Sequence, residues 1–243
     1  MYRTLEKLFA GRGFSKYPLY RAARKAYLRF LKGNVIEVNG YKMKIPYENC
    51  ADYDGRFHSG KVFEEEIVER LKKEVRENAV CVDIGASAGY YALLFASLAP
   101  RGRVLAIEPS ETANLLKGNI QLNGFLNVTA VQGALSDKIE GMSLPADWSE
   151  PAQKGTEFIS YPLNQKADEA DFIQMDVAGS EPKVYRGMKG MRIGTLITTF
   201  WPDLIRKTGE DPEQFMRELE KNFQVEVIPI NKSYSKLWCR IRS

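Results

Sequence analysis

The sequence predicts an α/β fold in which helices cover both faces of a doubly wound, mostly parallel sheet. From Val80 onward, short apolar segments alternate with segments of helical periodicity, which is the pattern of parallel strands joined by crossover helices. The last two apolar segments, 223–229 and 236–241, are separated by only six residues, so their strands must be antiparallel if they are neighbours. The predicted sheet therefore ends in an antiparallel hairpin.

Residues 1–60 are predicted to form an N-terminal extension, and residues 61–243 a single domain. In the extension, residues 17–32 have helical periodicity, and Asn39-Gly40 between two short apolar segments is a strong β-hairpin signal. An amphipathic helix over 61–77 opens the domain. Further strands are expected at 80–84, 103–108, 127–132, 171–176 and 194–200, short strands near 139–144 and 157–160, and helices at 90–98, 111–122, 181–189 and 212–222.

The turn after strand 80–84 is the centre of the predicted site. Asp83 lies near the end of that strand, and Glu108, followed by Pro109, ends the next one. Because neighbouring parallel strands end at the same edge of a sheet, we expect both acids to line one crevice. The turn between them has almost no side-chain bulk, which lets a ligand approach its backbone closely; it consists of Gly85, Ala86, Ser87, Ala88 and Gly89. A carboxylate like that of Glu108 accepts hydrogen bonds from a ribose diol, so the pattern predicts an adenosine-containing cofactor.

Cysteine usage predicts a cytoplasmic protein. The three cysteines, Cys50, Cys81 and Cys239, lack metal-ligand spacing, and the last two lie in predicted strands, as packed thiols of a reducing compartment do. No metal site is predicted. The stretch from Ile84 to Pro100 carries no charge, but its glycine-rich turn is unsuited to lipid, so we expect a strand, a turn and a helix there and no transmembrane segment.

The extension carries the basic charge of the chain. Residues 1–33 hold nine Lys or Arg and one acid, a net charge of +8, whereas the remainder has a net charge of −4. The helix over 17–32 has an apolar stripe and a basic face. This pattern fits a helix docked on the domain with a solvated basic face, a contact for nucleic acid, or a contact with a membrane surface.

The glycine spacing separates two classes of adenosine cofactor. From Asp83 to Gly89 the turn reads Asp-x-Gly-x-x-x-Gly, whereas a dinucleotide-binding turn reads Gly-x-Gly-x-x-Gly. The carboxylate of Asp83 would repel a pyrophosphate but not the cationic amino-acid end of S-adenosylmethionine. S-adenosylmethionine is therefore favoured over a nicotinamide dinucleotide.

At family level, the chain resembles the FkbM-type S-adenosylmethionine-dependent methyltransferases over residues 61–228. The similar motifs are Asp83-Ile-Gly-Ala-Ser-Ala-Gly-Tyr-Tyr91, Val104-Leu-Ala-Ile-Glu-Pro109, Leu116-Lys-Gly-Asn-Ile-Gln-Leu-Asn123, Ala134-Leu-Ser-Asp137, Met175-Asp-Val-Ala-Gly-Ser-Glu181 and Val184-Tyr-Arg-Gly-Met188. The resemblance implies a Rossmann-like, seven-stranded class I methyltransferase fold. It also implies O-methylation of a hydroxyl on a small molecule or glycan.

The resemblance also implies a role for individual residues. Asp83, Gly85 and Ala86 would line the methionine part of the cofactor, and Glu108 would hold its ribose. Ala134 and Leu135 would lie at the adenine, with their backbone reading its edge. Asp176 would lie beside the transferred methyl group, as a base or as an orienting group for the acceptor hydroxyl. The alternative for Asp176 is a cofactor contact or a cap for the helix that starts near Glu181.

Two positions depart from the family pattern. Ala178 and Thr199 stand where the family usually has glutamate. The loss of two carboxylates is compatible with a different substrate or with a cofactor-binding protein of weakened catalysis. A methyltransferase that acts on RNA through the basic extension is a further alternative.

Overall fold

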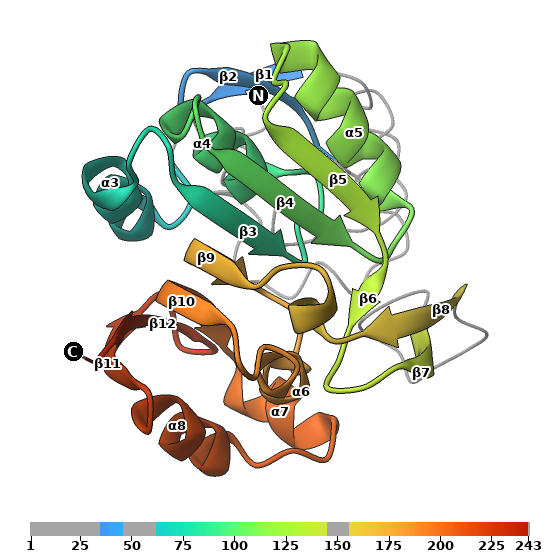
Figure 1. Ribbon diagram of the computed structural model, residues 1–243, viewed down its shortest axis with the longest axis vertical. Helices are drawn as coiled ribbons and strands as arrows, with labels where there is room; N and C mark the ends of the chain where they lie inside the picture. The colour runs from blue at the N-terminus through green and yellow to red at the C-terminus, as the bar shows by residue number, and fades with distance from the viewer. Residues whose placement is uncertain (1–34, 46–61, 145–155, 243) are drawn as a thin grey trace, which may run out of the picture. The chain divides into compact units, whose positions relative to one another are not determined.

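The computed structural model describes residues 35–45, 62–144 and 156–242 (Figure 1). The chain divides into two compact units between Val68 and Glu69. The predicted helix over 17–32, the predicted domain boundary at residue 60, and Cys50 lie outside the described residues.

The described part of the first unit contains the predicted hairpin. Strand β1 (Val35–Val38) pairs with β2 (Tyr41–Lys44) in antiparallel register, with Val38 opposite Tyr41. The two turn residues, Asn39 and Gly40, have φ angles of 51° and 84°, as a two-residue hairpin turn of the right twist requires. Helix α3 (Glu65–Glu74) starts in this unit and ends in the second, and it is shorter than the predicted 61–77.

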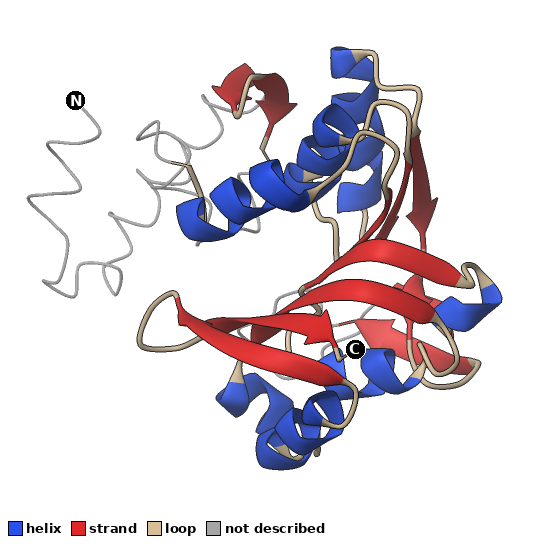
Figure 2. Cartoon of the chain, turned by 60° about the vertical axis from the view of Figure 1, so that its left-hand side comes forward, coloured by secondary structure: helices blue, strands red, loops and turns tan. Residues whose placement is uncertain are grey.

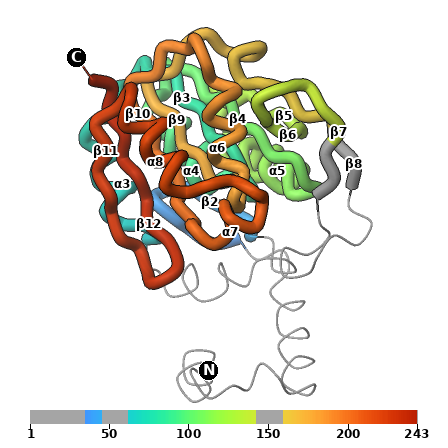
Figure 3. The backbone as a smooth tube through the Cα atoms, turned by 90° about the horizontal axis from the view of Figure 1, so that it is seen from below, coloured from blue at the N-terminus to red at the C-terminus, as the bar shows by residue number. Residues whose placement is uncertain are grey.

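The second unit is built on the predicted sheet, which has seven strands in the order β11-β12-β10-β9-β3-β4-β5. Strand β12 is antiparallel to both of its neighbours, and the other strands run parallel to one another. Figure 3 shows β11 at one edge of the sheet, next to β12, and β5 at the other edge. The strands are β3 (Val80–Ile84), β4 (Arg103–Glu108), β5 (Val128–Gln132), β9 (Glu169–Met175), β10 (Arg192–Phe200), β11 (Phe223–Pro229) and β12 (Ser235–Ile241). The predicted fold class and its terminal antiparallel hairpin are confirmed.

Helices lie on both faces of this sheet (Figure 2). They are α4 (Tyr90–Leu98), α5 (Thr112–Asn123), α6 (Glu181–Arg186), α7 (Pro202–Lys207) and α8 (Pro212–Glu220). Helix α6 is shorter than predicted; its C-cap is Gly187, where an added Cβ would lie 2.1 Å from the carbonyl oxygen of Ser136. Helix α7 was not predicted; it begins with Pro202, a residue suited to the first helical position.

Three short strands form a second sheet between β5 and β9 along the chain. Strand β8 (Thr156–Tyr161) lies between β6 (Ala134–Leu135), to which it is parallel, and β7 (Glu140–Leu144), to which it is antiparallel. The sequence predicted β7 and β8 but not the two-residue β6. The 3-10 helix η3 (Leu163–Gln165) leads into β9.

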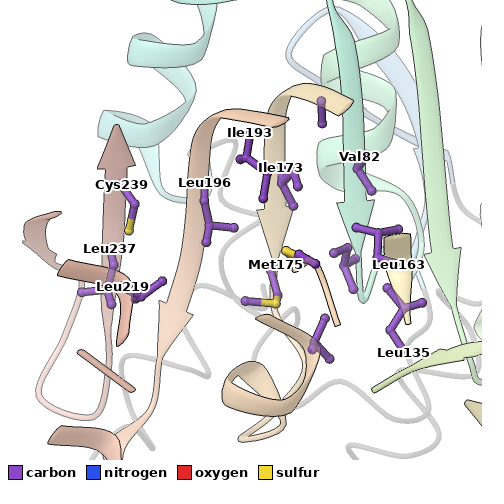
Figure 4. Packing of buried hydrophobic residues seen from close by; sticks show 14 of the residues in the cluster. Val82, Leu135, Leu163, Ile173, Met175, Ile193, Leu196, Leu219, Leu237 and Cys239 are labelled. Carbon is purple, nitrogen blue, oxygen red and sulfur yellow. The ribbon is translucent and has the colours of Figure 1, made fainter. Parts of the chain in front are cut away.

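The main hydrophobic core lies between the sheet and helices α6 to α8. Figure 4 shows side chains such as Val82, Ile173, Leu196 and Leu237 extending across the strands on this face. Cys81 and Cys239 are buried free thiols, as predicted, and burial raises the pKa of Cys239 to about 12. Within the described ranges, no helix has the length and apolarity needed to cross a membrane.

Candidate functional site

The turn after β3 is fixed between two neighbouring strand ends. The backbone N–H groups of Gly85 and Ala86 both donate to the carbonyl oxygen of Ile107, at 2.9 and 3.0 Å. On the other side, the N–H of Asp176 donates to the carbonyl oxygen of Ile84 at 2.9 Å. Gly85 has a φ of 75°, and a Cβ at this position would lie 1.9 Å from the carbonyl oxygen of Asp176. Only glycine therefore allows the strand ends to approach this closely.

The turn then leads directly into helix α4. Gly89 is the N-cap of α4 and has a φ of 99°, and an added Cβ there would lie 2.7 Å from Leu116 of α5. Ser87 also has a positive φ, 48°, which is uncommon for a residue with a side chain. The carbonyl oxygen of Ala88 accepts a hydrogen bond from the buried Asn119 side chain at 2.8 Å. Close packing against α5 thus holds the helix end in place.

Glu108 is buried at the end of β4 and is tied to the turn. Its Oε2 accepts a hydrogen bond from the N–H of Ser87 at 2.8 Å. Its Oε1 accepts two, from the N–H of Ser110 at 2.9 Å and from the Ser110 hydroxyl at 2.5 Å. An ionised carboxylate has about four acceptor positions, so Glu108 keeps room for one more donor, such as a ribose hydroxyl.

Asp83 is the least satisfied acid of the site. Its side chain is 2% exposed, and its Oδ2 has no hydrogen-bond partner among the described residues. Burial raises the pKa of this carboxyl to about 7, although a hydrogen bond from the backbone of Ala92 on α4 lowers it. The charges of Glu108 and Asp176 raise this pKa as well, which shows that the three predicted acids converge.

The turn after β9 places Asp176 beside Asp83. Glu181, a fully buried residue for which no role was predicted, holds this turn. The Oε1 of Glu181 accepts a hydrogen bond from the N–H of Val177 at 3.0 Å, and its Oε2 accepts one from the N–H of Gly179 at 2.8 Å. Burial and the charge of Asp176 raise the pKa of Glu181 to about 7. The N-cap of α6 is Ser180, without a side-chain cap, so the predicted alternative of a capping role for Asp176 is wrong.

The three remaining predicted residues follow the ends of β4 and β5; they are Pro109, Ala134 and Leu135. Pro109 follows Glu108 directly, and its carbonyl oxygen accepts a long hydrogen bond, 3.5 Å, from Gln132 at the end of β5. The next residue, Gly133, donates its N–H to the carbonyl oxygen of Glu108 at 3.2 Å. Ala134 and Leu135 follow as strand β6, with both side chains buried and their backbone paired to β8.

These groups fit S-adenosylmethionine. The unpartnered Oδ2 of Asp83 is a buried acceptor that a cationic amino group satisfies. The turn from Gly85 to Gly89 offers no large side chain, and Glu108 retains one acceptor position. In the described part of the chain, no three His, Cys, Asp or Glu residues are grouped as a metal ion requires. A shallow hollow of about 570 Å³ lies elsewhere, at the amino ends of β9 and β10, and includes none of the predicted site residues.

A second residue that sequence reasoning missed is Lys236, which is fully buried on β12. Its Nζ donates to the hydroxyl of Thr199 at 2.6 Å, and its charge lowers the pKa of Asp83. A lysine at the start of a predicted strand, followed by Leu237 and Trp238, was the only signal in the sequence. That signal had no meaning until the strand order placed β12 inside the sheet, between β11 and β10.

The comparison with protein families matches residues 35–143 to the TRM5/TYW2 methyltransferase domain. This stretch, less than half of the 243 residues, includes Asp83, the turn and Glu108. No curated protein matches the chain in sequence.

Solved structures match the fold. M. jannaschii TYW2 in complex with AdoMet has 19% sequence identity and a TM-score of 0.54, over 86% of this chain and 84% of that one. M. jannaschii tRNA m1G37 methyltransferase has 15% identity and a TM-score of 0.50, over 86% of this chain and 57% of that one. The FkbM methyltransferase from Methylobacillus flagellatus KT has 18% identity over 68% of this chain and 44% of that one, and its TM-score of 0.49 is too low to weigh. The class I methyltransferase fold implied by the resemblance is confirmed, whereas its assignment to the FkbM family gains no specific support.

Proposed function

We propose that the protein is an S-adenosylmethionine-dependent methyltransferase. The single observation that carries this proposal is the buried, unpartnered Oδ2 of Asp83 beside a turn without side-chain bulk. A buried acceptor without a donor is unfavourable by about 1–3 kcal/mol, so a cationic ligand group gains that amount by satisfying it. The match of residues 35–143 to a methyltransferase domain supports the same proposal.

We assign the cofactor contacts as follows. Asp83 accepts from the amino group of the methionine part, while Gly85, Ala86, Ser87 and Gly89 provide the surface against which that part lies. Glu108 accepts from a ribose hydroxyl, next to Pro109. Ala134 and Leu135 lie at the adenine. The convergence of Asp83, Glu108 and Asp176 at one edge of the sheet supports this assignment.

When bound, S-adenosylmethionine supplies an activated methyl group whose departure needs no acid. The protein must align the acceptor in line with the methyl group, exclude water and take up the proton of the acceptor. Asp176 is the proposed base or orienting group, because it is partly exposed at the carboxyl edge while its neighbours Asp83 and Glu181 are buried.

Two classes of acceptor are proposed, in this order. RNA is favoured by the match to the TRM5/TYW2 domain together with the net charge of +8 on residues 1–33, since a basic segment binds phosphates without sequence preference. A hydroxyl of a small molecule or glycan is favoured by the motifs shared with the FkbM-type enzymes. A cofactor-binding protein with weakened catalysis remains as the outcome in which neither acceptor is methylated.

The cofactor proposal is tested by calorimetry with S-adenosylmethionine, S-adenosylhomocysteine, NAD and NADP. We expect the two adenosyl-sulfur compounds to bind and the dinucleotides not to bind. Asp83→Asn and Glu108→Ala should each weaken binding about tenfold or more, which corresponds to the loss of one charged hydrogen bond of about 1.5–3 kcal/mol. Binding of NAD with equal affinity would contradict the proposal.

The acceptor is tested by transfer of a labelled methyl group to bulk tRNA and to a panel of sugars and hydroxylated small molecules. An RNA acceptor predicts labelled RNA and retention on RNA that falls steeply with salt. Asp176→Asn should abolish transfer while S-adenosylhomocysteine affinity stays within about threefold. Full turnover by this variant would show that Asp176 is not the base.

A further inference from the structure

Tyr161, the last residue of β8, borders the segment assigned to the adenine, residues 133–136. In the parallel pair of β6 and β8, Leu135 is in register with Tyr161, and the N–H of Ser136 donates to the carbonyl oxygen of Tyr161 at 3.2 Å. The side chain of Tyr161 lies at the other end of the segment, because a Cβ added at Gly133 would be 3.2 Å from its hydroxyl oxygen and from its Cε1. The backbone and the ring of one residue thus lie along the whole segment.

The hydroxyl of Tyr161 is a buried polar group without a partner. Its oxygen is closed off from solvent and has no hydrogen-bond partner among the described residues, although the residue as a whole is partly exposed. Burial raises the pKa of this phenol, so the hydroxyl keeps its proton at neutral pH and is a donor. Because a buried hydroxyl without a partner is unfavourable, an acceptor on a bound ligand would be favoured at this position.

Gly133 connects this hydroxyl to the cofactor site. It follows the last residue of β5, at the carboxyl end of the strand, and its N–H donates to the carbonyl oxygen of Glu108 at 3.2 Å. Gly133 does not have a positive φ, so its backbone conformation is open to other residues. What distinguishes it is the missing side chain, which would otherwise cover the hydroxyl of Tyr161. The ring itself is held by packing against the main hydrophobic core and by Lys166, whose Nζ lies 5.0 Å from the ring centroid.

We propose that Tyr161 is a further cofactor-binding residue, whose hydroxyl donates to a ring nitrogen of the adenine. This inference rests on the proposed function, which places the adenine at Ala134 and Leu135 and the ribose at Glu108. The ring nitrogens of adenine are acceptors, so a neutral donor suits them. Since the hydroxyl is closed off from solvent, the contact requires a small shift of the partly exposed ring, and Gly133 leaves room for it.

The hydroxyl is tested first without cofactor, by urea denaturation. Tyr161→Phe removes a hydroxyl that has no partner, so the midpoint should stay the same or rise. Tyr185→Phe is the matched control, because the hydroxyl of Tyr185 accepts a hydrogen bond from the side chain of Asn222 at 3.0 Å. Its midpoint should fall by about 0.3 M. An equal fall in Tyr161→Phe would show that its hydroxyl is already bonded and would overturn the proposal.

The contact with adenine is tested by calorimetry with S-adenosylhomocysteine and its 1-deaza, 3-deaza and 7-deaza analogues. In each analogue a carbon replaces one ring nitrogen. Tyr161→Phe should bind S-adenosylhomocysteine about threefold to tenfold more weakly than wild type, and Tyr185→Phe should bind it with unchanged affinity.

The analogues distinguish a contact from a structural role. For one of them, the loss of affinity that the wild type shows relative to S-adenosylhomocysteine should disappear in Tyr161→Phe, because the two changes remove the same hydrogen bond. A merely structural role of Tyr161 would weaken the binding of all four compounds equally, and this result would overturn the proposal.

The same measurements separate this inference from the proposed function. If the wild type binds S-adenosylhomocysteine and Tyr161→Phe binds it equally well, the role of Tyr161 is wrong and the proposed function stands. If the wild type binds none of the four compounds, the proposed function is wrong, and the role of Tyr161 is wrong with it.

Discussion

The start of the turn after β3 is held by backbone hydrogen bonds to the neighbouring strands, whereas the turn after β9 is held by the buried side chain of Glu181. In the first, Gly85 and Ala86 donate to Ile107, and the strand end accepts from Asp176. In the second, Glu181 reaches back from α6 and accepts from two backbone N–H groups. Both turns lie at the carboxyl edge of one sheet, and each contains a glycine without room for a Cβ: an added Cβ would lie 1.9 Å from the Asp176 carbonyl oxygen at Gly85 and 2.6 Å from the Leu204 carbonyl oxygen at Gly179. Both turns are therefore sensitive to added bulk, but only the second is held by an acid whose own pKa is raised to about 7.

The largest effect is expected when a methyl group is added to the first turn. In Gly85→Ala, the φ of 75° disfavours an L-residue by about 1–2 kcal/mol, and the overlap at 1.9 Å with the Asp176 carbonyl oxygen adds about 1–3 kcal/mol. We expect a decrease in the free energy of unfolding of about 3–4 kcal/mol, measured by urea denaturation. Because the overlap separates the strand ends that carry Asp83 and Asp176, cofactor affinity should be lost as well.

Gly124→Ala is the matched control for this substitution. Gly124 ends α5 with a φ of 67°, and nothing lies within 4 Å of a Cβ added there. Only the conformational effect applies, so we expect a decrease of about 1 kcal/mol and unchanged cofactor affinity. Equal decreases in the two variants would contradict the claim that the first turn has no room for a side chain.

The second turn should respond to pH through Glu181. The pKa of this carboxyl is raised from 4.5 to about 7 in the folded protein, so the folded state binds more protons than the unfolded state between these values. The stability that Glu181 contributes is therefore fully present below pH 4.5 and is lost as the pH rises through about 7. A difference of this size amounts to about 3 kcal/mol in the free energy of unfolding.

Glu181→Gln removes this dependence, because glutamine does not ionise. Measured by urea denaturation of the ligand-free protein, the stability of the variant relative to wild type should rise by about 3 kcal/mol from pH 4.5 to pH 7.5. The exposed Glu220→Gln serves as the control and should run parallel to wild type. A Glu181→Gln profile parallel to wild type would show that the buried carboxylate does not titrate in this range.

The two turns also differ in how much of them was predictable from the sequence. Asp83, the glycines and Glu108 are separated by short, fixed intervals along the chain, so local pattern and the parallel strand order suffice to bring them together. Glu181 was visible in a motif, but its function depends on a side chain folding back onto its own turn, for which the sequence carries no periodic signal.

The surroundings of Lys236 were even less predictable from the sequence. Its partners Thr199, Gln174 and Tyr91 come from three other elements, and the lysine meets them only because β12 inserts between β10 and β11. The sequence predicted that the last two strands are antiparallel, but not which of them forms the edge of the sheet and which lies inside it. A lysine on an edge strand is ordinary, whereas the same lysine on a central strand is a buried charge. Strand order, rather than strand location, was the missing information.

The smallest effects are expected where each turn carries a non-glycine residue at positive φ. Ser87 in the first turn and Ala178 in the second have φ angles of 48° and 51°. Replacement by glycine relieves about 1–2 kcal/mol of strain but adds about 0.4–1 kcal/mol of unfolded-state entropy, so each variant should gain up to about 1 kcal/mol in the free energy of unfolding.

The Glu181→Gln background separates the two gains. Because Glu181 holds the N–H groups on either side of Ala178, weakening this clamp lets Ala178 leave the left-handed region, and the gain from Ala178→Gly should shrink to within about 0.3 kcal/mol of zero. The gain from Ser87→Gly should persist, because the N–H of Ser87 is held by Glu108 and not by Glu181. Undiminished gains in both cases would mean that the chain itself, and not Glu181, sets the conformation of the second turn.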